Sequence, residues 1–162
     1  MNNNLTYYIV NNKGLENLIL YDNKKREIYF FKRKSSWFVK KYISIYDNQD
    51  FLLLEYTYFE IFLLWIKIVK NNLQNFSVIR KNPFQYKCLL DNKYVIELTI
   101  NWISIQTHYS NILLNGKKIG KISRDIFTLG ISFKIEFFEK SELIDRILIF
   151  ILMNMSNKEI CE

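Results

Sequence analysis

The chain has 162 residues and no change of composition that marks a second domain, so we expect one domain spanning 1–162 that buries about 70% of its unfolded surface. Apolar residues make up 49% and aromatic residues 17%, with only 4 glycines and 1 proline, which excludes a disordered, collagen-like or Gly/Ser-linker chain. The formal net charge of +7 favours anionic partners but says nothing about the fold.

The first half of the chain reads as short strands separated by turns, after a polar leader at residues 1–4. The polar residues 47–50 turn the chain between two of these strands, as in a hairpin. The last strand of this half is the most continuously apolar, which predicts a strand covered on both faces. The expected strands are 5–10, 15–21, 27–33, 42–46, 51–56 and 61–69.

The second half continues the same pattern. Asn115-Gly116 is its strongest hairpin signal, because a type I′ turn needs positive φ at both central residues. Pro83 must interrupt a ladder, since it has no backbone N–H. The expected strands are 76–80, 84–90, 94–100, 102–108, 112–114, 119–123 and the cleanly alternating 131–137.

The last apolar run, residues 143–155, is the segment around which we expect the chain to be organised. It is too short to cross a bilayer, which takes about 20 apolar residues. Ser141 can cap a helix here, and Glu142 and Asp145 suit its positive end. The many isoleucines are equally typical of a fully buried strand. The residues favour a helix but do not exclude the strand.

Roughly a dozen short strands at this spacing predict a sandwich or a barrel. With strands about 4.8 Å apart and tilted by about 40°, a dozen of them close to a backbone radius of roughly 12 Å. A helix with its side chains has a radius of about 5 to 6 Å, so one apolar helix and the inward side chains of the wall would fill such a barrel. A barrel threaded by a helix is therefore geometrically sensible.

The stretch Tyr109-Ser-Asn-Ile-Leu-Leu-Asn-Gly-Lys-Lys-Ile-Gly-Lys-Ile-Ser-Arg124, followed by 133–137 and 147–153, resembles the C-terminal half of the LURP-one-related proteins. That family belongs with the tubby C-terminal domains and the phospholipid scramblases. Residues 36–47 look like its first hairpin, so the resemblance covers 25–157. It implies a mainly β fold, a closed antiparallel β-barrel of about twelve strands around a central apolar C-terminal helix at 143–157.

The resemblance also bears on function. Tubby domains bind phosphoinositides through basic residues, and scramblases associate with membranes. This chain lacks the Cys-rich and Pro-rich segments of scramblases, and no tubby lipid-binding motif matches it position by position. The resemblance therefore implies a non-catalytic barrel that binds anionic lipid headgroups or a membrane surface, without scramblase activity.

The candidate binding residues lie in segment 24–41, where basic residues alternate with aromatic ones. Cations near an anionic bilayer contribute about 1 kcal/mol each, so several on one rim could hold the domain to a membrane. Nucleic acid would attract the same charges, but we do not expect it as the partner. The alternative is a solvated rim whose aromatics face the core. The predicted anion- and lipid-binding residues are Lys24, Lys25, Arg26, Lys32, Arg33, Lys34, Lys40 and Lys41.

The remaining reactive residues do not form a catalytic pattern. His108 is the single histidine and has no nucleophile or carboxylate pair around it, and Cys88 and Cys161 lack metal-ligand spacing. Gly116 and Gly120 do not form a phosphate-binding loop. We therefore expect no enzyme, no cofactor and no metal, and a cytoplasmic monomer that is peripheral at the membrane. A structural or protein-interaction barrel of unknown role without lipid binding is the alternative.

Overall fold

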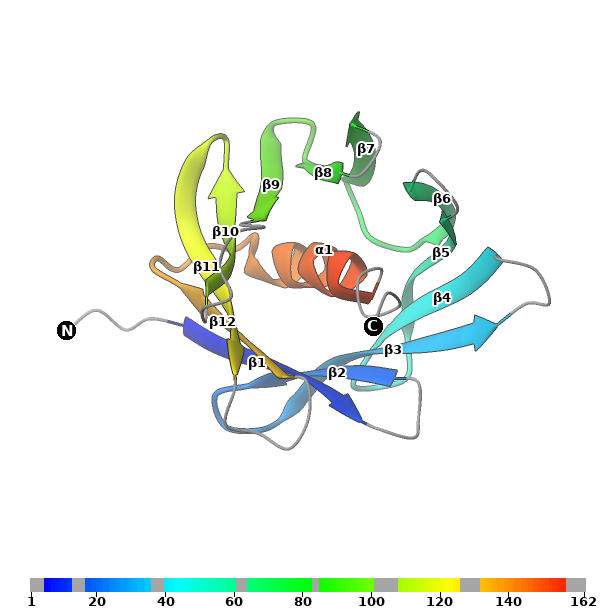
Figure 1. The fold of residues 1–162 in the computed structure, drawn as a ribbon, viewed down its shortest axis with the longest axis horizontal. Helices are drawn as coiled ribbons and strands as arrows, with labels where there is room; N and C mark the ends of the chain where they lie inside the picture. Colours follow the sequence, from blue (N-terminus) through cyan, green and yellow to red (C-terminus); the bar gives the residue numbers. More distant parts are fainter. Residues whose placement is uncertain are drawn as a thin grey trace.

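The computed structural model describes residues 5–12, 17–35, 40–60, 64–82, 85–100, 108–125 and 132–156. One antiparallel sheet of twelve strands curls into a barrel around a single described helix (Figure 1). The strands are β1 (Leu5–Asn12), β2 (Asn17–Asp22), β3 (Glu27–Ser35), β4 (Lys40–Asp47), β5 (Leu52–Glu60), β6 (Leu64–Asn71), β7 (Phe76–Asn82), β8 (Gln85–Leu90), β9 (Tyr94–Ile100), β10 (His108–Leu114), β11 (Lys117–Asp125) and β12 (Ser132–Phe137), and the helix is α1 (Ile144–Ser156).

The sheet consists of two meanders of sequential hairpins. The order around the barrel is β6-β5-β4-β3-β2-β1-β12-β11-β10-β9-β8-β7. The two meanders meet where β1 pairs with β12, with Leu5 opposite Phe137 and Ile9 opposite Phe133. The prediction of a mainly β, twelve-stranded antiparallel barrel around a C-terminal helix is confirmed.

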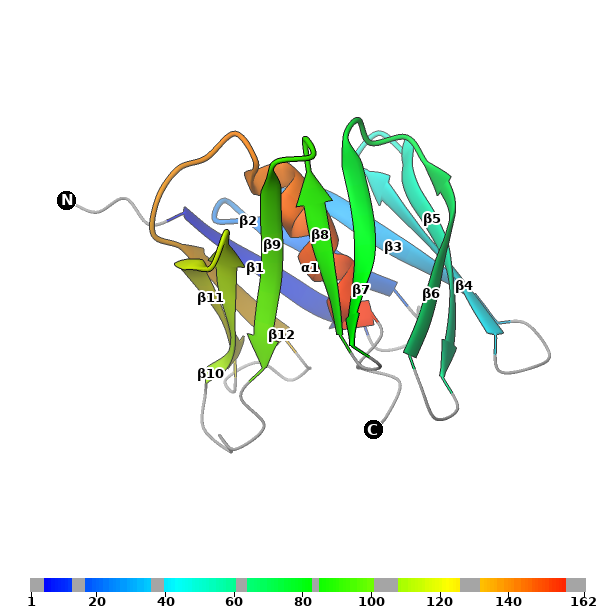
Figure 2. The ribbon, with the colours of Figure 1, turned by 90° about the horizontal axis from the view of Figure 1, so that it is seen from above.

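The two ends of the barrel differ. The turns at residues 23–26, 48–51, 72–75, 91–93 and 115–116 all lie at the end where α1 begins, which we call the helix-entry end. The opposite end, toward which α1 ends, is the helix-exit end. In Figure 2 the β6–β7 and β8–β9 turns and the start of α1 lie at the top, and the helix runs downward from there.

The tight turns form because their residues accept the left-handed region of φ. Asn115 has φ 49° and Gly116 has φ 81°, so the two-residue turn between β10 and β11 has the positive φ values that the sequence predicts. Asp50 likewise has φ 61° in the turn between β4 and β5. The Asp47 carboxylate stabilises that turn by accepting from the backbone N–H groups of Gln49 and Phe51, each at 2.9 Å.

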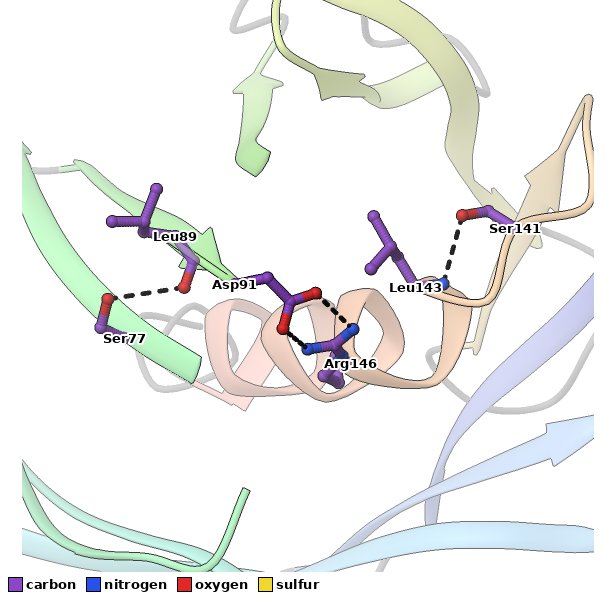
Figure 3. Close-up of polar contacts among 6 residues, drawn as sticks. All are labelled: Ser77, Leu89, Asp91, Ser141, Leu143 and Arg146. Carbon is purple, nitrogen blue, oxygen red and sulfur yellow. Dashed lines mark hydrogen bonds and ion pairs between the residues drawn. The ribbon is translucent and has the colours of Figure 1, made fainter. Parts of the chain in front are cut away.

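The last apolar run is a helix, not a strand. Its first turn is capped by Ser141, whose hydroxyl oxygen accepts from the Leu143 N–H at 3.2 Å (Figure 3). The helix is buried on all sides because the sheet surrounds it. The exposed fraction is 0% for the apolar side chains Ile147, Leu148, Phe150, Ile151, Leu152 and Met153.

The inner wall supplies the other half of the core. In β12 the buried residues are Phe133, Ile135 and Phe137, which confirms the predicted alternation for the described part of 131–137. Tyr56 of β5 reaches the helix, and its hydroxyl donates to the Met153 carbonyl at 3.3 Å. Alternation and closure together place one face of every strand against α1.

The barrel has a seam between β6 and β7, the two ends of the sheet order. Side chains bridge it. The Tyr86 hydroxyl accepts from the Ile66 N–H at 2.9 Å, and the Asn71 amide donates to the Phe76 carbonyl at 2.7 Å. The closed barrel that the sequence predicts is thus completed here by side-chain hydrogen bonds.

The structure corrects two strand predictions. Strand β6 is not covered on both faces, because Val69 is bulged out of the ladder with β5 at the edge of the sheet and is 52% exposed. The strand expected at 112–114 is longer, because β10 runs from His108 to Leu114, and the strand expected at 102–108 lies outside the described residues except for His108. Residues 101–107 and Pro83 lie outside the described residues.

Candidate functional site

The predicted basic residues do not form one patch. Lys24, Lys25 and Arg26 lie in the β2–β3 turn at the helix-entry end. Asp22 offsets part of their charge, since its carboxylate is 2.7 Å from the Arg26 guanidinium and accepts from the Lys24 N–H at 2.8 Å. Hydrogen bonding from the backbone of Arg26 lowers the pKa of Asp22. Asp22 therefore ties this turn together.

Lys32 lies on the outer face of β3. Its ammonium group is 5.0 Å from the ring centroid of Phe30 and 4.9 Å from that of Tyr46, and the two rings stack at 5.3 Å. The same ammonium is 3.6 Å from the Asp50 carboxylate. Contacts within the chain therefore keep the Lys32 side chain packed along the outer face of the sheet.

Arg33 and Lys41 face the inside of the barrel. Arg33 is paired with Ile43, which is 0% exposed, and Lys41 lies two residues before Ile43 on the same face of β4. The Nε atom of Arg33 is buried and has no hydrogen-bond partner. Lys34 and Lys40 belong to β3 and β4, but their side chains lie outside the described part of the structure.

Two further inward cations come from the other meander. Arg80 of β7 is paired with buried Tyr86. Arg124 of β11 is paired with Phe133, which is 5% exposed, and follows Ile122 on the inward face, but near the end of its strand its own side chain is exposed. The sequence prediction missed both, because it considered only the basic residues grouped in segment 24–41. The alternation of inward and outward side chains along each strand could have identified them, since each stands two positions after an apolar residue that faces the core. We call Arg33, Lys41, Arg80 and Arg124 the basic ring.

The basic ring lies toward the helix-exit end. Each of its members is on the exit side of a core or core-packed residue of its own strand, namely Phe31, Ile43, Val78 and Ile122. Helix α1 presents its carbonyl end in this direction and has no basic residue in its last turn. A helix C-terminus carries only about half a negative charge, so four full positive charges still dominate the field here.

Acidic residues gather at the opposite end. Among the side chains that the structure describes, no carboxylate faces the barrel interior beside the basic ring, because Glu55, Glu97 and Glu136 lie on outward positions. The carboxylates at or next to the helix-entry turns and the start of α1 are Asp22, Glu27, Asp47, Asp50, Asp91, Glu139, Glu142 and Asp145. Cations share this end, so the two signs roughly balance there and the net positive charge of the described residues lies farther along the barrel. These cations are Lys24, Lys25, Arg26, Lys93, Lys117, Lys118, Lys140 and Arg146.

At the helix-entry end, Asp91 connects the β8–β9 turn of the barrel to the first turn of α1. Its carboxylate accepts two hydrogen bonds from Arg146, at 2.8 and 2.9 Å (Figure 3). The hydrogen bonds from Arg146 lower the pKa of Asp91. An arginine in the first turn is unfavourable beside the positive helix end, and Asp91 offsets that charge. The pair is structural and joins the β8–β9 turn to α1.

The reactive residues that the sequence analysis singled out are either buried or outside the described side chains. Cys88 is buried in the core, and this burial raises the pKa of its thiol to about 12. His108 begins β10, and its side chain lies outside the description, as does Cys161. The described ranges hold no group of three His, Cys, Asp or Glu residues placed to bind a metal ion.

Comparison with known proteins supports the fold alone. No protein-family model matches the chain, and no curated protein matches it either. The chain is similar to an X-ray structure of a protein from Arabidopsis thaliana, with a TM-score of 0.53 and 10% sequence identity over 93% of this chain and 89% of that one. Within the described ranges, no helix has the length and hydropathy needed to cross a bilayer. The chain therefore shares its architecture with a protein of very different sequence.

Proposed function

We propose that this protein is a non-catalytic barrel that binds anionic lipid headgroups at a membrane surface through the cations of its helix-exit end. The observation that carries the proposal is the separation of charge along the barrel. Carboxylates gather at the helix-entry end, whereas the paired strands β3 and β4 carry basic residues toward the other end. The surface consists of Arg33, Lys34, Lys40 and Lys41 together with the rest of the basic ring; Lys32 is not part of it, because its ammonium group lies against Asp50 of a helix-entry turn.

The magnitude is sufficient for reversible membrane binding. A cation near an anionic bilayer contributes about 1 kcal/mol, so four of them together strengthen binding by about 10³-fold. The attraction extends over a Debye length of about 8 Å at physiological ionic strength. Binding of this kind needs no catalytic group, and it places the protein in the cytoplasm and peripherally on the membrane.

Co-sedimentation with vesicles tests the proposal. We expect the protein to bind vesicles that contain phosphatidylserine, to release them as salt is raised, and not to bind pure phosphatidylcholine. The variant Arg33→Gln/Lys34→Gln/Lys40→Gln should lose most of this binding. The control Lys93→Gln/Lys117→Gln/Lys140→Gln removes the same charge from the helix-entry end and should retain it. Equal losses in both variants, or no binding to either vesicle, would refute the proposal.

A structural or protein-interaction barrel is the second candidate, and a row of apolar residues on the outer wall favours it. Val10, Ile19, Phe30, Tyr46 and Leu52 stand opposite one another across β1 to β5. Val10 is 36% exposed. This function predicts a protein partner that is still captured after Lys32, Arg33 and Lys34 are neutralised but is lost from an Ile19→Asp variant. Loss of the partner from the neutralised variant would argue against it.

A further inference from the structure

We infer that the basic ring is a binding site for one multiply charged anion of the phosphate monoester class. The inference rests in part on the proposed function, because a lipid headgroup is one source of such a group. A free phosphate compound is the other source. The inference goes further than membrane attraction, since it requires a defined site with one ligand per barrel.

The four cations surround the interior instead of lying along one edge. Arg33 and Lys41 come from the neighbouring strands β3 and β4. Arg80 comes from β7, which lies across the seam from β6, and Arg124 comes from β11, on the other side of the β1–β12 junction. Strands from three separate parts of the sequence thus direct positive charge toward the same end of the lumen.

The local surroundings leave one donor of this ring without an acceptor. Lys41 and Arg80 each have an interaction of their own. The buried Nε–H of Arg33 has none, although a buried donor is nearly always paired in a folded protein. The carbonyl end of α1 is the acceptor that the fold itself supplies at this end, and its partial charge is small beside four cations. A bound anion would supply the acceptor that the Arg33 Nε–H lacks.

The composition of the ring indicates the class of anion. Three of its four members are arginines, whose planar guanidinium groups donate two parallel hydrogen bonds to an oxyanion. A carboxylate has one charge and two oxygens, which suit a single arginine. A phosphate monoester carries a charge of about −1.5 to −2 and three terminal oxygens, so it can accept from arginines of different strands at once.

Two ligand probes distinguish the two sources. Glycerol 3-phosphate, measured by titration calorimetry, presents the phosphate monoester without a lipid. Phosphatidic acid vesicles present the same group on a membrane, and phosphatidylserine vesicles of equal surface charge present none. We expect saturable binding of glycerol 3-phosphate with one site per barrel, or a preference for phosphatidic acid over phosphatidylserine, or both. Binding in the first arm alone indicates a free phosphate compound, and a preference in the second indicates a lipid.

The barrel wall offers a charge-matched control. The variant Arg33→Gln/Arg80→Gln/Arg124→Gln removes three inward charges, and Lys81→Gln/Lys87→Gln/Lys121→Gln removes three outward charges from β7, β8 and β11. A hydrogen bond to a charged group is worth at least about a tenfold change in affinity, so we expect the inward variant to lose at least about 100-fold and the outward variant to bind normally. The single variant Arg33→Lys keeps the positive charge but lacks the planar guanidinium group that donates two parallel hydrogen bonds. It should therefore bind the anion more weakly than the parent protein. This variant provides the test if the triple variant does not fold.

The outcomes separate this inference from the proposed function. If both triple variants lose binding equally in every arm, or if no arm shows saturable or preferential binding, the ring is not a site. Binding to phosphatidylserine vesicles could still persist, and the proposed function would then stand without the ring. Saturable binding of glycerol 3-phosphate by a protein that ignores all vesicles would support the ring and refute the proposed function.

Discussion

Two glycines show how differently the same residue is used in this chain. At Gly120 a Cβ atom would lie 2.5 Å from the Glu136 carbonyl oxygen of the neighbouring strand β12. At Gly116 nothing lies within 4 Å, but φ is +81°. The first glycine permits close packing of two strands, and the second permits a tight turn.

Alanine substitutions at these positions should therefore differ in cost. Gly120→Ala forces backbone atoms apart and should lower the free energy of unfolding by about 3 kcal/mol. Gly116→Ala only incurs the left-handed backbone penalty of about 1 kcal/mol. Urea denaturation of the two variants measures both values. A larger loss at Gly116 than at Gly120 would contradict this account of the β11–β12 contact.

The carboxylates of Asp22 and Asp91 should make stability depend on pH. Hydrogen bonds from Arg26 and Arg146 lower their pKa values below the ordinary value of 3.8. A carboxyl with a lowered folded-state pKa stabilises the fold fully above its unfolded pKa, and this contribution is lost as the pH falls through the folded value.

We therefore expect the urea midpoint to fall as the pH is lowered from about 5 to 2. The double variant Asp22→Asn/Asp91→Asn should be less stable at neutral pH and should show a shallower decline in acid. A decline in the double variant that is as steep as in the parent would show that other groups control the acid response.

At the scale of the elements, the central helix holds the most continuous run of buried apolar residues. Phe150 is 0% exposed and lies within the barrel, whereas Phe51 in the β4–β5 turn is 57% exposed. Phe150→Ala should lower the free energy of unfolding by about 3 to 5 kcal/mol, because it opens a cavity between α1 and the wall. Phe51→Ala serves as the matched control and should change stability by less than about 0.5 kcal/mol. Similar losses in both variants would mean that the helix is not the core of the domain.

Local signals in the sequence predicted most elements but not every boundary. The turns at 47–50 and 115–116 and the cap at Ser141 were predictable because each depends on residues a few positions apart. The choice between helix and strand for 143–155 was not settled by the residues themselves. A continuous apolar run is compatible with both, and only enclosure by the sheet makes a helix that is apolar all round stable.

At the scale of the whole molecule, the seam should be the weakest part of the wall. Strands β6 and β7 each have one ladder partner, whereas β1 and β12 each have two. We expect backbone amides of β6 and β7 to exchange with deuterium before those of β1 and β12, as measured by mass spectrometry. Tyr86→Phe should speed exchange at Ile66 further, because it removes the acceptor of that N–H. Uniform protection around the barrel would contradict a seam closed by side chains.

The candidate site was predictable only in part, for a reason that also belongs to this scale. The sequence grouped Lys24 to Lys41 because they are close in the chain, but β3 separates its two ends along the barrel axis. Lys24, Lys25 and Arg26 therefore lie at the end opposite Arg33 and Lys41. Arg80 and Arg124 belong with Arg33 only after the sheet has curled, since they come from other strands.

The sequence by itself determined the mainly β class, the positions of most strands and tight turns, and the presence of one buried apolar element at the C-terminal part of the chain. These follow from alternation and turn chemistry, which act between residues near one another. Tertiary structure alone decided that β1 pairs with β12, that the seam falls between β6 and β7, and that four separated cations face one end of the lumen. The physical reason is that closure of a sheet depends on its curvature and register, and no short stretch of residues encodes either one.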